Sequence, residues 1–296
     1  MSDRASPSLP YVILDVFTDR PFAGNPLAVV LDADTLSGGQ LQRIAREFNL
    51  SETAFPMAPT DEGADYRLRI FTPAAEIPFA GHPSVGSAWW LARSGRIGTG
   101  VVRQECGAGL LPVEVTDEGA TLTGGAASVS DPVDADTALR AVGLERTDLV
   151  DGEVRIASTG LPFAIAFVAP DAVARCAPDM AVLRTEFAHP RPATGVYVVD
   201  WDAEVRHARV RMFAGDLGSA EDPATGSAAL ALGARLVARG DFPDGTQTFT
   251  VEQGVDMGRP SRLTVTCDIA QGVVERLQVT GGAVLVSEGR IAIPPT

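Results

Sequence analysis

The sequence predicts an α+β protein built from two similar halves. Its 296 residues suggest two domains, at about 100–200 residues per domain. Two segments of the first half recur in the second: Arg67–Phe71 (RLRIF) as Arg209–Phe213 (RVRMF), and Pro83–Ala88 (PSVGSA) as Pro223–Ala228 (PATGSA). The offsets are 142 and 140 residues, so one short gap aligns the two copies. Long helices and many strands without regular β–α alternation favour α+β over α/β.

The first half begins with strands and one amphipathic helix. Short β-rich or alternating runs predict strands at Tyr11–Phe17, Leu27–Leu31, Thr53–Phe55 and Tyr66–Phe71. Between the second and third of these, apolar residues recur at helical spacing at Leu41, Ile44, Ala45 and Phe48. Ser37 is the expected N-cap of this helix.

Each half then contains a helix that is apolar nearly all round. The first follows Gly81-His82-Pro83 and ends near Gly95, and the second spans Ala228–Arg239 and closes at Gly240. A helix without a polar face is normally buried, so we expect each half to wrap a curved sheet around its own central helix. Gly124–Pro132 (GGAASVSDP) predicts a linker between the halves.

We expect both helix N-termini to point into a cleft between the halves. A helix N-terminus offers unpaired N–H groups and the positive end of the helix dipole, which together bind anions. The cleft should therefore favour a small molecule that bears a carboxylate.

Composition excludes several classes of protein. All 24 basic residues are arginine, so a lysine Schiff base, the usual anchor of pyridoxal phosphate, and a P-loop are both excluded. A net charge of −14 and a pI near 4.6 argue against nucleic-acid binding. The first ten residues lack the apolar region of a signal peptide, and no apolar run reaches membrane-spanning length. We expect a cytoplasmic protein that binds neither nucleic acid nor membranes.

The cysteines and histidines do not predict a metal site or a disulfide framework. Three widely spaced cysteines (Cys106, Cys176 and Cys267) are expected to be buried or inert thiols. The three histidines (His82, His189 and His207) have no metal-ligand spacing. The sequence has neither a G-x-S-x-G nucleophile elbow nor a complete dinucleotide-binding fingerprint. Of the chemistries considered, this leaves acid–base catalysis by carboxylates and one histidine, without a cofactor.

The repeat singles out His82 and Asp222. A lone histidine in a turn can be purely structural. However, His82 aligns with Asp222, and each stands just before the proline that opens a helix. A structural duplication does not need two different titratable groups at equivalent helix starts, so this pair favours a function.

Three further residues allow two interpretations each. Glu52 can be a solvated carboxylate, or a general base whose pKa is raised in an apolar cleft. Asn25 can be a turn residue or a ligand-binding residue. Arg259 can form a surface ion pair or meet an anionic substrate.

At this point the sequence resembles the PhzF-like phenazine-biosynthesis family, which shares the diaminopimelate epimerase fold. The resemblance covers nearly the whole chain, and its motifs occur in the family's order: Asp15–Phe17 (DVF) with Gly24–Pro26 (GNP), Ser51–Phe55 (SETAF), Arg69–Pro73 (RIFTP) with Glu76, Gly81–Gly86 (GHPSVG), Glu221–Ala228 (EDPATGSA), Gln253–Gly254, and Gly258–Pro260 (GRP). GHPSVG and EDPATGSA, each opening a helix, are highly specific.

The resemblance implies two pseudo-symmetric, diaminopimelate epimerase-like domains, each a barrel-like sheet around a central helix, with the active site between them. The domains would span residues 8–123, completed by strands at about 278–296, and residues 130–277. The family implies a homodimer. Its characterised phenazine-pathway enzyme isomerises trans-2,3-dihydro-3-hydroxyanthranilate by moving a proton between carbons.

The resemblance also implies roles for individual residues. Glu52 would be the main acid–base group, assisted by His82 and Asp222. The substrate pocket would include Asn25, Ser51, Gly81, Gly226 and Ser227, with backbone N–H groups holding the carboxylate. No metal or other cofactor is implied.

The chain departs from relatives of this fold that use two cysteines to racemise amino acids. Its three cysteines all lie outside the two helix-start loops, so we reject that mechanism. The sequence predicts a cofactor-independent isomerase of a small carboxylate. The alternatives are a non-catalytic small-molecule binding protein on the same fold and a related elimination or tautomerisation enzyme.

Overall fold

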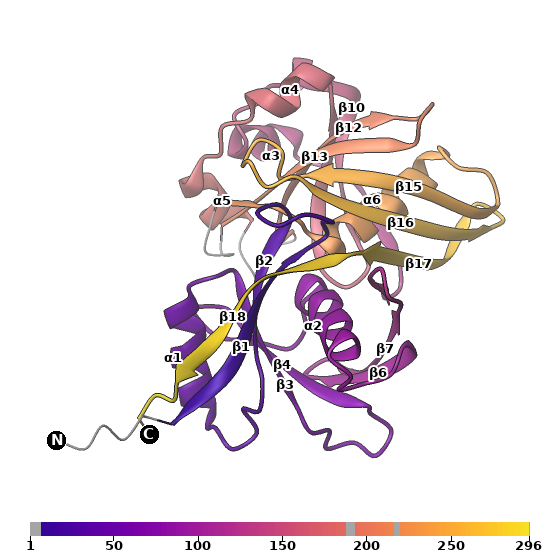
Figure 1. Cartoon of the computed structure of the whole chain (residues 1–296). Coiled ribbons are helices and arrows are strands. Elements are labelled where there is room, and N and C mark those ends of the chain that lie inside the picture. Colours follow the sequence, from indigo (N-terminus) through magenta and orange to yellow (C-terminus); the bar gives the residue numbers. More distant parts are fainter. Residues whose placement is uncertain (1–6, 188–192, 216–219, 296) are drawn as a thin grey trace. The chain divides into compact units, whose positions relative to one another are not determined.

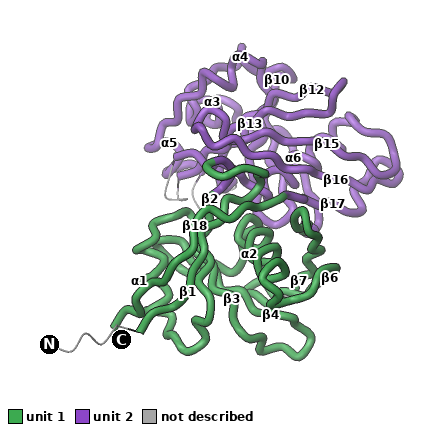
Figure 2. The backbone as a smooth tube through the Cα atoms, in the orientation of Figure 1, with its two compact units in different colours: residues 1–22, 26–122, 282–296 green, residues 23–25, 123–281 purple. Residues whose placement is uncertain are grey.

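The computed structural model describes residues 7–187, 193–215 and 220–295, so His189 lies outside the described residues. The chain divides into two compact units, drawn in green and purple in Figure 2. The unit that we call the N-unit comprises Met1–Phe22, Pro26–Leu122 and Gly282–Thr296. The C-unit comprises Ala23–Asn25 and Thr123–Gly281. Each unit combines strands of both orientations with helices (Figure 1), which confirms the predicted α+β class.

The N-unit contains most of the strands of the first half and the last strand of the chain. They are β1 (Ser8–Val16), β2 (Asn25–Val30), β3 (Glu52–Met57), β4 (Tyr66–Phe71), β5 (Glu76–Ile77), β6 (Gly100–Cys106), β7 (Gly109–Val115), β8 (Ala120–Thr123) and β18 (Ala283–Ala292). β18 is antiparallel to β1, and β2 runs parallel to β3. β4 is antiparallel to β3 and β5 and parallel to β6, from which β7 and β8 continue as antiparallel strands.

Helix α1 (Gly38–Phe48) starts directly after Ser37, the predicted N-cap, and contains the apolar residues predicted at helical spacing. Ser37 forms a capping box with Gln40: the Ser37 hydroxyl accepts from the Gln40 N–H, and the Gln40 side chain accepts from the Ser37 N–H. Asn49 ends the helix in the left-handed conformation, at φ 51°. The apolar face of α1 packs on Phe55 and Phe71, whose rings meet edge to face.

Helix α2 (Gly81–Arg93) is the central helix of the N-unit. It contacts β1, β3, β7 and β18, and most of its residues are buried, as its apolar sequence predicts. Gly86 permits the close approach: a Cβ there would lie 2.7 Å from Val16 Cγ2 and 2.8 Å from Leu27 Cδ2. None of the helices in the described part of the chain has the length and apolar character needed to cross a bilayer.

The C-unit contains the remaining strands: β9 (Ser128–Val133), β10 (Leu149–Ser158), β11 (Pro162–Val168), β12 (Gly195–Asp202), β13 (His207–Ala214), β14 (Glu221–Asp222), β15 (Gly245–Gln253), β16 (Ser261–Ala270) and β17 (Val273–Gly281). Its central helix, α6 (Gly226–Arg239), contacts β9, β10, β11, β16 and β17. Gly240 closes α6 at φ 82°, as predicted. A second core includes residues of α3 (Ala135–Ala141), α4 (Pro170–Arg175) and α5 (Met180–Glu186), and a 3-10 turn, η1 (Arg146–Asp148), precedes β10.

The two units repeat the same strand pairing. In the C-unit, β9 and β10 are antiparallel, β11 is parallel to β12, and β13 is antiparallel to β12 and β14 and parallel to β15. β15, β16 and β17 then form an antiparallel meander. This order matches β18, β1, β2, β3, β4, β5, β6, β7 and β8 strand for strand, so the internal repeat predicted from the sequence is present in the fold.

An arginine–glutamate pair recurs at the same register in both units. Arg69 forms two hydrogen bonds of 2.7 Å with Glu76, and Glu76 stands opposite Phe71. Arg211 binds Glu221 in the same two-point manner, at 2.9 and 2.7 Å, and Glu221 stands opposite Phe213. Each pair secures the short strand that leads toward a central helix.

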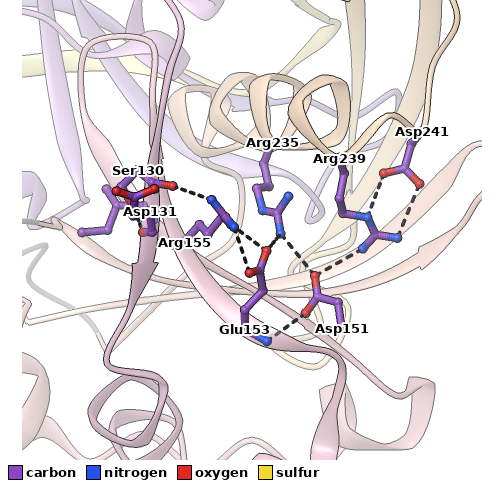
Figure 3. A network of polar contacts seen from close by, with 9 residues as sticks. Ser130, Asp131, Asp151, Glu153, Arg155, Arg235, Arg239 and Asp241 are labelled. Carbon is purple, nitrogen blue, oxygen red and sulfur yellow. Dashed lines mark hydrogen bonds and ion pairs between the residues drawn. The ribbon is translucent and has the colours of Figure 1, made fainter.

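A charge network anchors the C-terminal half of α6 to β10 (Figure 3). The nearly buried Arg235 binds Glu153 at 2.6 Å and Asp151 at 3.3 Å, and Arg155 shares Glu153. Arg239 joins Asp151 to Asp241 and stacks over the Phe167 ring at 4.2 Å. A buried arginine is tolerated here because carboxylates surround it.

Two local predictions were wrong. The linker predicted at Gly124–Pro132 is strand from Ser128 onward, because β9 pairs with β10. Helix α2 begins at Gly81, so His82 lies inside its first turn and not before it. The N–H groups of the first helical turn have no partner within the helix, so proline, which has no N–H, loses no helical hydrogen bond there. Pro83 can therefore occupy the third helical position. Asp222, by contrast, lies on β14, four residues before α6 begins.

Candidate active site

Glu52 and His82 form a close pair within the N-unit. Glu52 is the first residue of β3, and His82 is the second residue of α2. Glu52 Oε2 lies 3.3 Å from His82 Nδ1, and the two side chains are 14% and 5% exposed. The structure therefore brings together two residues that are 30 positions apart and were predicted separately.

Burial shifts the titration of Glu52 toward neutral pH. It raises the pKa of the Glu52 carboxyl group to about 7, while a hydrogen bond with Ser51 acts in the opposite direction. A group with this pKa exists in both protonation states near neutral pH, so it can accept a proton and return it. Ser51, predicted as a pocket residue, thus lies beside the carboxylate.

The starts of the two central helices carry no capping side chain. Gly81 is the first residue of α2 after Ala80, which has no side-chain acceptor. Gly226 and Ser227 open α6 after Thr225, whose hydroxyl does not cap the helix. Neither first turn contains an acidic residue. In each unit the helix start therefore keeps backbone N–H groups and the positive dipole end that suit an anion.

Asp222 lies in a second polar cluster, within the C-unit. Asn25 Nδ2 donates to Asp222 Oδ1 at 2.9 Å and to the Ala224 carbonyl at 3.0 Å. The Thr225 hydroxyl donates to Asp222 Oδ2 at 2.5 Å. Asn25 is 1% exposed, so a buried amide anchors the partly buried Asp222 carboxylate.

Gln253 and Tyr197 complete this cluster, and sequence reasoning assigned them no role. The Gln253 side chain contacts Asp222, Thr225 and Tyr197, and it is fully buried. Gly254 follows at φ 74°, and a Cβ there would lie 2.7 Å from the Pro223 carbonyl oxygen. Because Gly254 has no side chain, the backbone at the end of β15 can approach the backbone at Pro223, next to Asp222. The Gln253–Gly254 motif is part of the family resemblance, but it did not predict that Gln253 contacts Asp222, Thr225 and Tyr197.

Arg259 supports the loop that carries Asn25. Its guanidinium donates to the carbonyl oxygens of Gly24 and Ala23 at 2.8 and 2.7 Å. The backbone adds a bond from the Gly24 N–H to the Pro260 carbonyl at 3.1 Å. Arg259 therefore binds backbone carbonyl groups of this loop. The sequence had predicted either a surface ion pair or a contact with an anionic substrate, and neither includes this role.

The three cysteines are free thiols, and none of them belongs to the residues that open a central helix. Cys106 ends β6, Cys176 follows α4 and Cys267 lies on β16. Burial raises the pKa of Cys176 to about 11 and that of Cys267 to about 12, which disfavours the reactive thiolate. These positions agree with the rejection of a two-cysteine mechanism.

Comparison with known proteins identifies the family. The model of the phenazine biosynthesis-like (PhzC-PhzF) family matches residues 14–289. The chain belongs to this family. It is 36% identical over 299 residues to an uncharacterized isomerase of Mesorhizobium japonicum, with 96% of this chain and 98% of that protein covered.

Two further relatives of this PhzF-like chain support the same class. It is 35% identical over 294 residues to the trans-2,3-dihydro-3-hydroxyanthranilate isomerase of Pseudomonas aeruginosa, with 95% and 98% of the two chains covered. Its structure is similar to the PhzF-family phenazine biosynthesis protein of Bacillus anthracis, with a TM-score of 0.85, 29% identity, and 96% and 99% coverage. The predicted family and the predicted isomerase class are confirmed.

Proposed function

We propose that this PhzF-like isomerase moves a proton between carbon atoms of a small carboxylate, with Glu52 as the acid–base group and without a cofactor. Glu52 takes a proton from a carbon that a conjugated system activates. The same carboxyl group returns the proton at another position of that system. This sequence of steps isomerises the substrate with no net change in its protons.

The Glu52–His82 pair is the observation that carries this proposal. A base must hold its proton weakly enough to release it and strongly enough to remove it, and a pKa of about 7 meets both needs at neutral pH. His82 Nδ1, 3.3 Å from the carboxylate, orients Glu52 and assists the transfer. One positioned acid–base group contributes about 10²–10⁴-fold to a rate.

The helix starts supply the substrate-binding groups in the proposal. The N–H groups at Gly81, or at Gly226 and Ser227, would hold the substrate carboxylate. Ser51 and Asn25 would contribute to the pocket, and Asp222 would assist in orienting the substrate and relaying the proton. A second carboxylate that accepts hydrogen bonds is suited to orienting a substrate amine or hydroxyl.

The relatives suggest which substrate class to test first. One relative is named for the isomerisation of trans-2,3-dihydro-3-hydroxyanthranilate, a compound with a carboxylate and an activated C–H bond. We propose substrates of this kind, cyclic or linear, in which the carboxylate lies near the enolisable carbon.

The test compares wild type with Glu52→Gln, which keeps the shape of the side chain and removes its basicity. Wild type should form an isomer from at least one member of a panel of such carboxylates. Glu52→Gln should be slower by about 10²-fold or more. The matched control is Glu47→Gln, an exposed glutamate of α1, which should retain wild-type turnover. Equal rates for wild type and Glu52→Gln would overturn the proposal.

We also propose that the protein is a cytoplasmic homodimer, with the two domains at residues 8–123 plus 278–296 and at 130–277. Family resemblance supports the dimer, and the domain limits rest on the repeat and the resemblance. Light scattering on the purified protein should give twice the chain mass of 30.9 kDa. A value of one chain mass at micromolar concentration would contradict the dimer.

A further inference from the structure

A chain of hydrogen bonds in the C-unit begins at buried side chains and ends on the partly buried Asp222 carboxylate. It starts at Tyr197 on β12, passes through Gln253 at the end of β15, and reaches Thr225, the N-cap residue of α6. The Tyr197 hydroxyl donates to Gln253 Oε1 at 3.1 Å, and Gln253 Nε2 donates to Thr225 Oγ1 at 3.0 Å. Thr225 Oγ1 lies 2.5 Å from Asp222 Oδ2. Tyr197 and Gln253 are both 0% exposed.

Two backbone groups fix the orientation of the Gln253 amide. Its oxygen accepts from the Thr225 N–H at 3.3 Å, and that N–H can only donate. Its nitrogen donates to the Asp222 carbonyl at 2.7 Å, and that carbonyl can only accept. The amide cannot be flipped without losing both bonds.

This orientation decides the direction of every other bond in the chain. Because Gln253 Oε1 is an acceptor, Tyr197 must donate, and burial raises the pKa of Tyr197 so that it keeps its proton. Because Gln253 Nε2 is a donor, Thr225 Oγ1 must accept from it. The single hydroxyl hydrogen of Thr225 is then directed at Asp222 Oδ2, while Asn25 donates to Oδ1.

The N-unit contains a similar chain with a different end point. Tyr66 donates to Gln104 Oε1 at 2.9 Å, and Gln104 Nε2 donates to Ser84 Oγ at 3.0 Å. The Ser84 hydroxyl then donates to the Ala80 carbonyl at 2.9 Å, which is backbone. Only the C-unit chain, of the two, delivers its last hydrogen bond to a carboxylate that the sequence singles out for chemistry.

We propose that Thr225 is a positioning residue: its hydroxyl, oriented by Gln253, holds the Asp222 carboxylate in one orientation with both oxygens as hydrogen-bond acceptors. The proposal rests on the proposed proton-transfer function, to which Asp222 contributes. It adds Thr225, Gln253 and Tyr197 to the residues on which turnover depends.

The test compares Thr225→Val, which keeps the branched shape and removes the hydroxyl, with Thr225→Ser, which keeps the hydroxyl. Thr225→Val should lower kcat about 10–100-fold, the rate equivalent of one charge-assisted hydrogen bond, with KM changed less than kcat. Thr225→Ser should recover most of the lost kcat. Thr225→Ala provides a second removal of the hydroxyl if the valine variant does not fold.

Tyr66→Phe is a control in the N-unit, where Tyr66 is the counterpart of Tyr197. It removes the first donor of the chain that ends on backbone, so the thermal midpoint should fall while kcat stays near the wild-type value. A loss of kcat in Tyr66→Phe as large as that in Thr225→Val would mean that damage to any buried chain reduces turnover. That result would overturn the positioning role.

Crystal structures of Thr225→Val and Thr225→Ser test the orientation without relying on activity. The Asp222 carboxylate should rotate or split into two conformers in the valine variant and remain in place in the serine variant. An unmoved carboxylate in Thr225→Val would overturn the proposal, whatever the kinetics. If wild type isomerises no carboxylate of the panel, the proposed function fails, while these structures still decide the positioning role.

Discussion

Glu52 keeps its proton to higher pH in the folded protein than in the unfolded chain. Burial raises the pKa of the Glu52 carboxyl group from an ordinary value of 4.5 to about 7. Between these values the folded state binds more protons than the unfolded state, so the free energy of unfolding decreases as pH rises. Well below pH 4.5 the carboxyl group is protonated in both states, and its burial as a charge costs no stability. Well above pH 7 the group is ionised in both states, and the full free-energy cost of burying the charge applies.

The first prediction is that Glu52→Gln is more stable than wild type at alkaline pH. A neutral amide avoids the cost of burying a charge, which amounts to roughly 3 kcal/mol above pH 7. Urea denaturation of both proteins at pH 4.5 and pH 8 should show a stability difference that favours the variant more at pH 8. The same difference at both pH values would contradict the burial of an ionisable Glu52.

The second prediction concerns the pH dependence of turnover. The proposed base is the ionised form of Glu52, so kcat/KM should rise with pH up to a pKa of about 7 and then level off. Well below this pKa the slope should be about tenfold per pH unit. Initial rates from pH 5 to 9 on an active substrate measure the profile. A constant kcat/KM between pH 5 and 7 would rule out Glu52 as the ionised base.

Single residues differ in how far the sequence could predict them. His82 and Asp222 could be singled out because the repeat aligns them, whereas Glu52 stood out only through the family resemblance. Tyr197 and Gln253 could not, because a tyrosine and a glutamine in strands are ordinary core residues until their partners are known. Asn25 and Asp222 are 197 positions apart, and no local pattern predicts their hydrogen bond.

Helix signals with a local cause were predicted well. Ser37 and the apolar spacing that follows it predict α1, and Gly240 predicts the end of α6, because caps depend on neighbouring residues alone. The predicted start of α2 is too late, because proline is compatible with several positions in the first turn. The prediction of a linker at β9 is wrong, because its small and polar residues form a strand only through pairing with β10.

The third prediction is that the capping box contributes to stability and not to turnover. Ser37→Ala removes the acceptor for the Gln40 N–H and should lower the free energy of unfolding by about 1 kcal/mol. Ser37→Asp retains a capping oxygen and should stay near wild type. Denaturant titrations and initial rates of both variants check this. A reduced kcat in Ser37→Ala, measured well below its unfolding transition, would contradict the separation.

At the scale of the whole molecule, the duplicated architecture was predictable because the repeat leaves matching segments in the sequence. Arg69 and Arg211 occupy equivalent registers and make equivalent glutamate pairs. Their surroundings differ, however. The Arg69 and Glu76 side chains are 20% and 43% exposed, whereas those of Arg211 and Glu221 are 10% and 12% exposed. The sequence shows the shared pair but not this difference in burial.

The fourth prediction follows from this difference. Arg69→Met should lower the free energy of unfolding by about 1 kcal/mol or less, because an exposed ion pair contributes little. Arg211→Met should cost about 3 kcal/mol or more, because it leaves Glu221 without its arginine and also removes bonds to the Val173 and Cys176 carbonyls. Parallel denaturant titrations compare the two variants. Equal costs would contradict the assigned difference in burial.

Proton NMR in D₂O detects whether Glu52 transfers a proton on a small carboxylate. Wild type and Glu52→Gln are incubated with trans-2,3-dihydro-3-hydroxyanthranilate and a panel of enolisable cyclic and linear carboxylates. We predict that wild type forms an isomer or incorporates deuterium at a specific carbon of at least one compound, and that Glu52→Gln does neither at a comparable rate. Isomer formation and deuterium incorporation by Glu52→Gln at the wild-type rate would contradict the acid–base role of Glu52.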